Sequence, residues 1–271
     1  RVVAGGLGDL LVIKRTENDR GIKRSKIVVE DVRRTKNFFH MTAGEGGWRI
    51  VIVDSADEMN VNAANALLKV LEEPPPQALL LLVSHNSGQL LPTIRSRCQK
   101  IRLEPLTATV VADFLSRHAP EASIQDLQII TALSDGSIGR ALRLLENSGV
   151  SVFTEIMTLL EGAPQIDGNM LHAFAAKCAG KKGTDTFAMA DEIIRWILVR
   201  AIKYASGGRT GEFSDREQAL YGRLSDAASL DRWLKVWEKV DELLASTDRV
   251  NLDRKQVILN TFSCVSQAAK A

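Results

Sequence analysis

The sequence is poor in cysteine and contains no long apolar run. Its three cysteines are too far apart for a disulfide framework or a paired metal-ligand motif, so we expect reduced thiols: Cys98, Cys178 and Cys264. The longest uninterrupted apolar stretch, Ala78 to Val83, is far shorter than the ~20 residues that a membrane span needs. We therefore expect a cytoplasmic protein that makes no membrane contact.

A large excess of charge of one sign is also absent. The net charge of +2 excludes a nucleic-acid binder that is basic over its whole surface. The charge is nevertheless uneven, because residues 1–36 hold ten Lys and Arg against five Asp and Glu. This basic flank could meet phosphate, although composition alone favours a solvated rim formed by Lys14, Arg15, Arg20, Lys23, Arg24 and Lys26.

The first hundred residues alternate short apolar runs with helical periodicity, which is typical of an α/β fold. Continuous apolarity in the central runs indicates strands buried on both faces of a parallel sheet. Asn60 or Asn62 can cap a helix that Pro74 to Pro76 ends. A further helix is predicted over residues 30–41. Strands are predicted over residues 10–14, 49–54, 78–84 and 99–103.

After Pro105 the strand patterns stop and amphipathic helices follow one another. We expect an α/β domain over residues 1–104, a small helical domain over 105–150 and a second helical domain over 151–271. The clearest predicted helices cover residues 107–118, 123–134, 137–149, 184–205, 230–245 and 253–269.

Polar side chains follow two of the predicted strands. In parallel sheets, ligands gather beyond the carboxyl ends of the strands. Asp54 and Ser55 stand at one such end, where a carboxylate can help to hold Mg²⁺, and Ser84 and Asn86 stand at the next, where they could sense a phosphate. Ordinary strand-end turns explain these residues at least as well, and nothing near His85 completes a catalytic set.

Several longer motifs occur in a fixed order over residues 54–57, 60–75 and 91–98. Together they resemble the AAA+ clamp-loader subunits of bacterial DNA polymerase III, and among these most closely the delta-prime subunits. The match covers about residues 25–150, and residues 251–256 are similar to the family's collar. The resemblance implies an amino-terminally truncated AAA+ P-loop-type α/β core, a helical lid and a helical collar that serves oligomerisation, within the three ranges given above.

One departure from the family's ATPases concerns the end of the second strand. The resemblance assigns Asp54 to the metal-binding position, and ATPase subunits carry a glutamate base directly after it. Here that position is Ser55, whose hydroxyl is no efficient base near neutral pH. We expect this degenerate Walker B site to be crippled in hydrolysis, and Asp57 and Glu58 to point elsewhere.

A second departure is the missing phosphate loop. No Gly-x-x-x-x-Gly-Lys-Ser/Thr occurs, and the glycine-rich segments 5–8 and 44–47 both lack its lysine. The chain begins with Arg1 rather than Met. Since only 53 residues precede Asp54, we expect the first strand and its loop to lie upstream of Arg1.

The motif Ser96-Arg97-Cys98 is intact. By resemblance, Arg97 is an arginine finger that reaches the γ-phosphate of ATP bound by a neighbouring subunit. A guanidinium suits this role because it is always charged and offers several fixed donors. Arg95 is the natural control for an ordinary surface arginine. A packed thiol is the simpler interpretation of Cys98 than an activated one.

Arg140 stands in the first turn of a predicted helix, where the helix dipole disfavours a cation. This position suggests that an anion lies nearby. The family's second sensor arginine would fall on Gly139, so Arg140 is about 100° away around the helix. Arg140 is therefore only a weak candidate for nucleotide sensing.

The resemblance favours a subunit of the DNA-directed DNA polymerase holoenzyme that is not an enzyme by itself. We assign no cofactor or metal to such a subunit itself. It would serve as a scaffold and donate Arg97 to ATP and Mg²⁺ bound in a neighbouring subunit. The implied partners are the tau/gamma and delta subunits, the sliding clamp and, through the complex, primer–template DNA. The alternatives are an active tau/gamma-like ATPase, against which Ser55 argues, and a DNA-binding module of unrelated mechanism.

Overall fold

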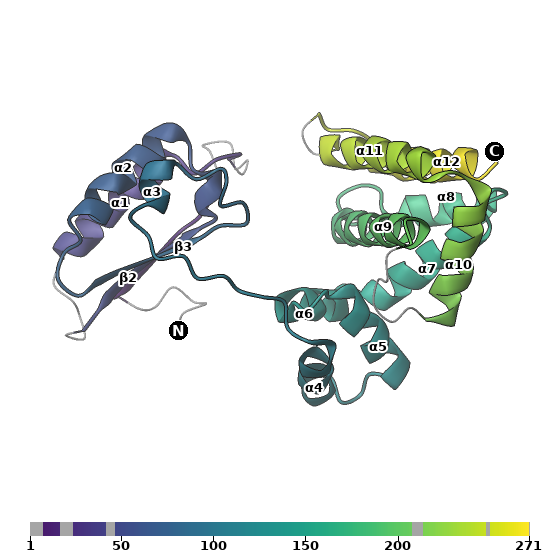
Figure 1. The fold of residues 1–271 in the computed structure, drawn as a ribbon, viewed down its shortest axis with the longest axis horizontal. Coiled ribbons are helices and arrows are strands. Elements are labelled where there is room, and N and C mark those ends of the chain that lie inside the picture. Colours follow the sequence, from purple (N-terminus) through teal and green to yellow (C-terminus); the bar gives the residue numbers. More distant parts are fainter. Residues whose placement is uncertain (1–7, 17–23, 42–46, 208–213, 248–249, 271) are drawn as a thin grey trace. The chain divides into compact units, whose positions relative to one another are not determined.

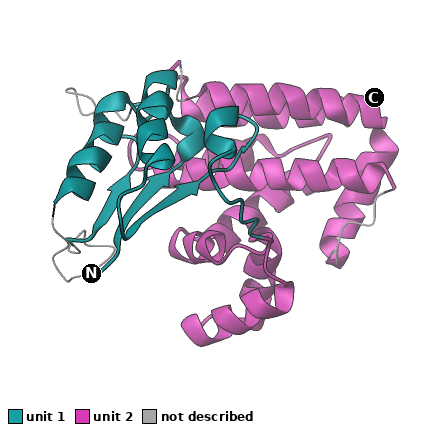
Figure 2. Ribbon diagram, turned by 60° about the vertical axis from the view of Figure 1, so that its left-hand side comes forward, with its two compact units in different colours: residues 1–103 teal, residues 104–271 magenta. Residues whose placement is uncertain are grey.

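The computed structural model describes residues 8–16, 24–41, 47–207, 214–247 and 250–270. The chain divides into two compact units, Arg1–Leu103 and Glu104–Ala271 (Figures 1 and 2). The first unit is a small parallel sheet with helices, and the second is helical. This agrees with the predicted succession of an α/β part and an all-α part.

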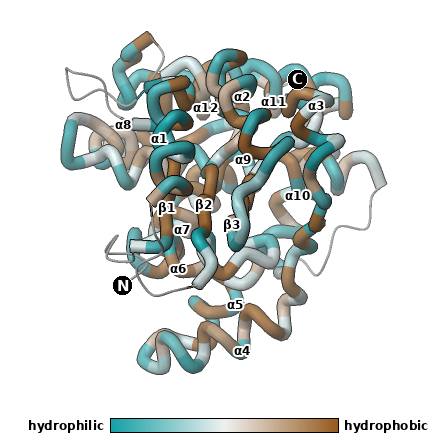
Figure 3. Tube along the Cα trace, turned by 90° about the vertical axis from the view of Figure 1, so that its left-hand side faces the viewer, coloured by the Kyte–Doolittle hydropathy of each residue, from teal (hydrophilic) through white to brown (hydrophobic). Residues whose placement is uncertain are grey.

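The sheet of the first unit has three parallel strands in the order β1-β2-β3, which lie side by side in Figure 3. They are β1 (Leu10–Ile13), β2 (Arg49–Asp54) and β3 (Ala78–Val83). The register pairs Val53 with Leu82 and Asp54 with Val83. Because both strands run in the same direction, the residues that follow Asp54 and Val83 leave the sheet at the same edge.

One face of the sheet is buried against helices α1 (Val29–His40) and α2 (Val61–Glu72). Asn60 caps α2, since its side-chain oxygen accepts a hydrogen bond from the Ala63 amide at 2.8 Å. A short 3-10 helix, Ala56–Glu58, joins β2 to α2, and the short helix α3 (Pro92–Arg95) packs beside α2. The core of this unit is made by Ile13, Ile27, Val32, Phe38, Phe39, Val51, Val53, Ala56, Ala63 and Leu67.

The opposite face of the sheet differs from the prediction. Burial on both faces was expected, but four apolar side chains on this face are 40% to 43% exposed: Val12, Leu79, Leu81 and Val83. A continuous apolar run shows only that the side chains on both faces of the strand are suited to burial. It does not show that another element covers each face. Among the described residues, the helices of this unit pack on one face, so the other is uncovered.

The predicted strand over residues 99–103 is also wrong. This segment has no strand partner in the described structure, and Ile101 and Leu103 are 76% and 88% exposed. Its alternating apolar pattern is that of a strand, but a strand exists only where a neighbour completes its hydrogen bonds.

The second unit contains nine helices within its described residues. The predicted helices α4, α5, α6, α9, α11 and α12 are confirmed to within a few residues, whereas α7, α8 and α10 were not among those predicted. Their bounds are α4 (Ala108–His118), α5 (Ile124–Leu133), α6 (Ile138–Glu146), α7 (Gly149–Glu161), α8 (Gly168–Lys177), α9 (Thr184–Ala205), α10 (Asp215–Ala227), α11 (Leu230–Ser246) and α12 (Arg254–Ala268).

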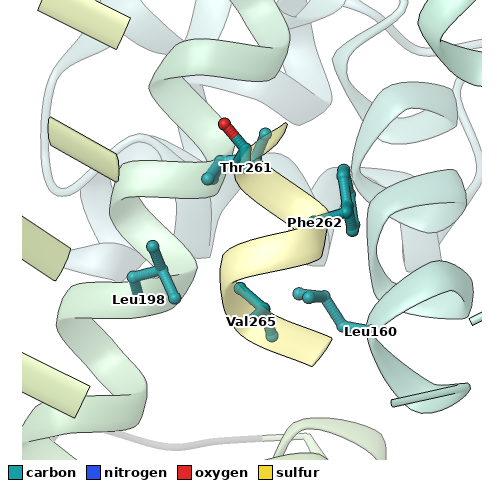
Figure 4. A pocket seen from close by; sticks show the side chains of 6 residues that line it. Leu160, Leu198, Thr261, Phe262 and Val265 are labelled. Carbon is teal, nitrogen blue, oxygen red and sulfur yellow. The ribbon is translucent and has the colours of Figure 1, made fainter. Parts of the chain in front are cut away.

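One hydrophobic cluster runs through this unit, from Val111 in α4 to Ala268 in α12. The division of the unit at residue 150 stays a prediction. A small apolar hollow between α7, α9 and α12 has no charged lining (Figure 4) and carries no sign of a ligand site; its walls are Leu160, Ile194, Leu198, Thr261, Phe262 and Val265.

The three cysteines are unpaired, as expected. Cys178 is buried, and burial raises its pKa to about 11, while Cys98 and Cys264 are half-buried. Within the described residues, every helix is too short or too polar to cross a bilayer.

We expect Asn60→Ala to destabilise the first unit by about 1 kcal/mol, because the substitution removes the only side-chain acceptor that the structure shows at the start of α2. Urea denaturation monitored by circular dichroism measures this loss. Asn62→Ala is the matched control, since Asn62 is exposed within the first turn. It should leave stability unchanged or raise it by up to ~0.5 kcal/mol. Equal losses in the two variants would contradict the cap assignment.

Candidate functional site: a strand-end cluster and an exposed arginine

The pairing of β2 with β3 brings the predicted polar residues to one edge of the sheet. Asp54 is exposed at the end of β2, and Ser55 donates a long hydrogen bond of 3.5 Å to its carboxylate. Ser84 and Asn86 follow β3, and the Asn86 side chain accepts a hydrogen bond from the Gly88 amide at 3.1 Å. The pairing of Asp54 with Val83 places the residues that follow the two strands at the same edge, and the Asn86 oxygen accepts a hydrogen bond within its own turn.

Asp57 connects the two strand ends, a role that the sequence did not reveal. Its carboxylate accepts a hydrogen bond from the His85 amide at 3.1 Å. Burial raises the pKa of Asp57, but hydrogen bonds from the backbone amides of Asp57 and His85 outweigh it, so the pKa lies below its ordinary value of 3.8. The nearby Ser84 hydroxyl lowers it further, although its geometry falls short of a hydrogen bond.

The second carboxylate after Ser55 is also engaged within the chain. Glu58 binds the Arg15 side chain at 2.8 Å. Arg15 therefore belongs to the structure of this edge, while Lys14 and Lys26 of the basic flank are exposed. Arg20 and Lys23 lie outside the described residues, as do the glycines at positions 5, 6, 44 and 46.

The described strand-end residues do not by themselves supply a complete set of ligands for a magnesium nucleotide. Asp54 supplies one carboxylate, and Ser55 supplies a neutral hydroxyl in place of a base. Within the part of the chain that the structure describes, no three His, Cys, Asp or Glu side chains are arranged to hold a metal ion. No catalytic step follows from these described residues.

The Ser96-Arg97-Cys98 motif directly follows α3. Ile94 is buried and anchors this short helix, whereas Ser96 and Arg97 are exposed at its end. The Ser96 hydroxyl donates to the Thr93 carbonyl oxygen at 3.1 Å and closes the turn. Cys98 is half-buried, and burial raises its pKa, so the packed-thiol interpretation fits better than an activated thiol.

Arg97 differs from Arg95 in its contacts. One guanidinium nitrogen, Nη2, lies 2.7 Å from Oε1 of Glu72 in the last turn of α2, and Nη1 donates to the Thr93 carbonyl oxygen at 3.0 Å. Arg95 makes no side-chain hydrogen bond or ion pair to the described residues. In the sequence, only the Ser-Arg-Cys motif distinguishes Arg97 from Arg95. No sequence pattern indicates that Glu72 is the partner of Arg97.

Helix α2 separates Arg97 from the strand-end cluster. Asn60 caps the start of the helix next to the loop that follows Asp54, whereas Glu72 is its last residue. A helix of this length spans about 17 Å. The guanidinium therefore lies by the far end of α2, away from this chain's own Asp54.

Arg140 is held by two carboxylates of its own unit. Its guanidinium lies 2.8 Å from Asp135 and 2.5 Å from Glu192, and Asp135 also accepts a hydrogen bond from the Trp196 indole at 3.1 Å. The predicted nearby anion is thus part of the chain itself. A role of Arg140 toward a nucleotide stays a prediction.

Comparison with known proteins connects the chain to DNA polymerase III. Residues 1–107 match the family model described as DNA polymerase III, delta subunit. The DNA polymerase III delta-prime subunit of Haemophilus influenzae is 33% identical over 251 residues, which cover 86% of this chain and 70% of that protein. The delta-prime subunit of Pseudomonas aeruginosa is 37% identical over 165 residues, covering 61% of this chain.

The DNA polymerase III tau subunit of Bacillus subtilis is more distant, at 24% identity over 246 residues and 89% of this chain. The matched part spans 48% of the Pseudomonas protein and 42% of the Bacillus protein. The likeness therefore concerns a part of these two relatives rather than their full length.

We expect Asp57→Asn to destabilise the first unit by about 1 kcal/mol at pH 7, because the ionised carboxylate joins the two strand ends. Since the folded-state pKa is lowered, this stability is present above about pH 3.8 and is lost as the pH falls through the folded-state pKa. Denaturation curves at several pH values measure the difference. Asp54→Asn, at an exposed position, serves as control and should change little. A difference between Asp57→Asn and the parent chain that is independent of pH would contradict this role.

Proposed function

The chain belongs to the delta-prime subunits of the DNA polymerase III clamp loader, and on this premise we propose that it helps to load the sliding clamp onto primed DNA without hydrolysing ATP itself. Its contribution is a scaffold and one arginine, Arg97, which acts on ATP bound by an adjoining subunit. The observation that carries this proposal is the exposed Arg97 guanidinium at the far end of α2 from the chain's own Asp54.

The strand-end cluster supports the absence of hydrolysis. An ATPase of this family needs a carboxylate base beside the metal-binding aspartate, and Ser55 offers only a neutral hydroxyl there. The next two carboxylates along the chain are occupied, because Asp57 holds the His85 amide and Glu58 holds Arg15. Either of these two carboxylates would have to give up its contact to act as the base.

The position of Arg97 supports action in trans. A guanidinium donates to phosphate oxygens through several N–H groups and stabilises the charge that develops during phosphoryl transfer. Arg97 stands at the surface directly after the short helix α3, in which Ile94 is buried, so its side chain is presented outward from a fixed support. Among the described residues, the strand-end cluster around Asp54 lies by the other end of α2 from Arg97.

The remaining parts of the chain fit a ring subunit. In this proposal the first unit is the AAA+ core, residues 105–150 are the lid and residues 151–271 are the collar that joins the tau/gamma and delta subunits. The sliding clamp and primer–template DNA are reached through the assembled complex. ATP and Mg²⁺ act in the neighbouring subunit.

We expect Arg97→Ala to lower ATP turnover at the adjoining site of the assembled clamp loader at least tenfold, since a finger supplied in trans is worth ~10³ to 10⁵ in comparable GTPases. Steady-state ATP hydrolysis of the reconstituted complex with primed DNA and clamp measures this effect. Arg95→Ala is the matched control and should retain nearly full turnover. Assembly, followed by size-exclusion chromatography, should be unchanged in both variants. Equal turnover in the two variants would remove the finger assignment.

The isolated full-length protein should show no ATP turnover above background, because it lacks a base beside Asp54. Substantial turnover that Asp54→Asn abolishes would favour an active tau/gamma-like ATPase instead. Salt-sensitive binding of duplex DNA by the isolated protein, unchanged by the other subunits, would favour a separate DNA-binding module.

A further inference from the structure

Two contacts within this chain hold the side chain of Arg97. Its Nη2 lies 2.7 Å from Oε1 of Glu72, and its Nη1 donates to the Thr93 carbonyl oxygen at 3.0 Å. The first contact comes from α2 and the second from α3, so two separate elements fix one guanidinium. The side chains of Arg97 and Glu72 remain 36% and 48% exposed.

This ion pair is a poor device for stabilising the fold. An exposed pair between two long side chains gains little, because water screens the attraction and both side chains lose rotamer freedom. Helices α2 and α3 already pack together without the ion pair, and Ile94 of α3 is buried. The pair is therefore better explained by what it does to the arginine than by what it adds to the core.

The geometry leaves Arg97 able to donate further hydrogen bonds. A guanidinium carries five N–H groups, and the two described contacts use one on each terminal nitrogen. The others, including Nε–H, remain to meet an anion. A side chain that is already ordered loses less freedom when it binds than one that samples many rotamers.

We propose that Glu72 is a positioning residue for Arg97: its carboxylate, together with the Thr93 carbonyl, holds the guanidinium in the orientation in which it meets the phosphate of a neighbour's nucleotide. This inference rests on the proposed function of Arg97 as a finger. Glu72 touches neither nucleotide nor metal, and it acts only through the arginine.

The chain offers a matched control for Glu72. Glu73 is the next residue, is also exposed, and its side chain makes no hydrogen bond or ion pair to the described residues. Replacing either glutamate removes one negative charge from the same end of α2. A general effect of charge or of helix stability would thus appear in both variants, whereas an effect on the finger would appear at Glu72 alone.

The test is ATP hydrolysis by the complete reconstituted clamp loader with primed DNA. We expect Glu72→Ala to lower turnover about threefold to tenfold, and Glu73→Ala to leave it unchanged. Glu72→Gln keeps the length and an acceptor oxygen without the charge, so it should retain an intermediate rate. The double variant Glu72→Ala, Arg97→Ala should be no slower than Arg97→Ala alone, because Glu72 has nothing to position once the arginine is absent.

The melting temperatures of the Glu72→Ala and Glu73→Ala chains should agree, which separates positioning from a structural role. Equal turnover of Glu72→Ala and Glu73→Ala would overturn the proposal, as would a rise in turnover, which would mean that Glu72 restrains the finger. A further loss in the double variant would also overturn it. If Arg97→Ala does not change ATP turnover, the finger assignment fails. If Arg97→Ala lowers turnover but Glu72→Ala does not, only the positioning role of Glu72 fails.

Discussion

The packing of α2 against the parallel sheet is the contact on which both ends of the first unit depend. Ala63 and Leu67 are fully buried in that contact, so the helix has one fixed position over the strands. Its first turn is capped by Asn60 next to the polar strand ends, and its last residue, Glu72, holds Arg97. A shift of this one helix would move the strand-end loop and the arginine together.

In the second unit, the Arg140 cation lies in the first turn of α6, which is an unfavourable position for a positive charge. The helix dipole opposes the charge of Arg140 there. Asp135 and Glu192 compensate for it, and Asp135 is itself oriented by the Trp196 indole of α9. The same residues therefore neutralise the charge and join the turn before α6 to α9. Because the cation is only 18% exposed, losing one partner would leave it poorly solvated.

Most elements of the fold were predictable because their signals are local. Apolar periodicity, together with a cap such as Asn60, gave the helices that were predicted to within a few residues. The predicted strand over residues 99–103 failed because a strand needs a partner elsewhere in the chain. For the same reason, the apolar runs of β2 and β3 did not show that one face of the sheet is uncovered among the described residues.

The sequence by itself determined which residue types stand at the chemically decisive positions: a serine at position 55 where a base would act, and an arginine at position 97 in an intact motif. Those identities are properties of single positions, so no structure is needed to read them. Only the tertiary structure decided that Asp57 holds the loop after β3, that Glu72 holds Arg97, and that Arg140 is paired with Asp135 and Glu192. Except for the local pair of Asp135 and Arg140, these contacts join segments that are distant in the chain, and they exist only once sheet pairing and helix packing have brought those segments together.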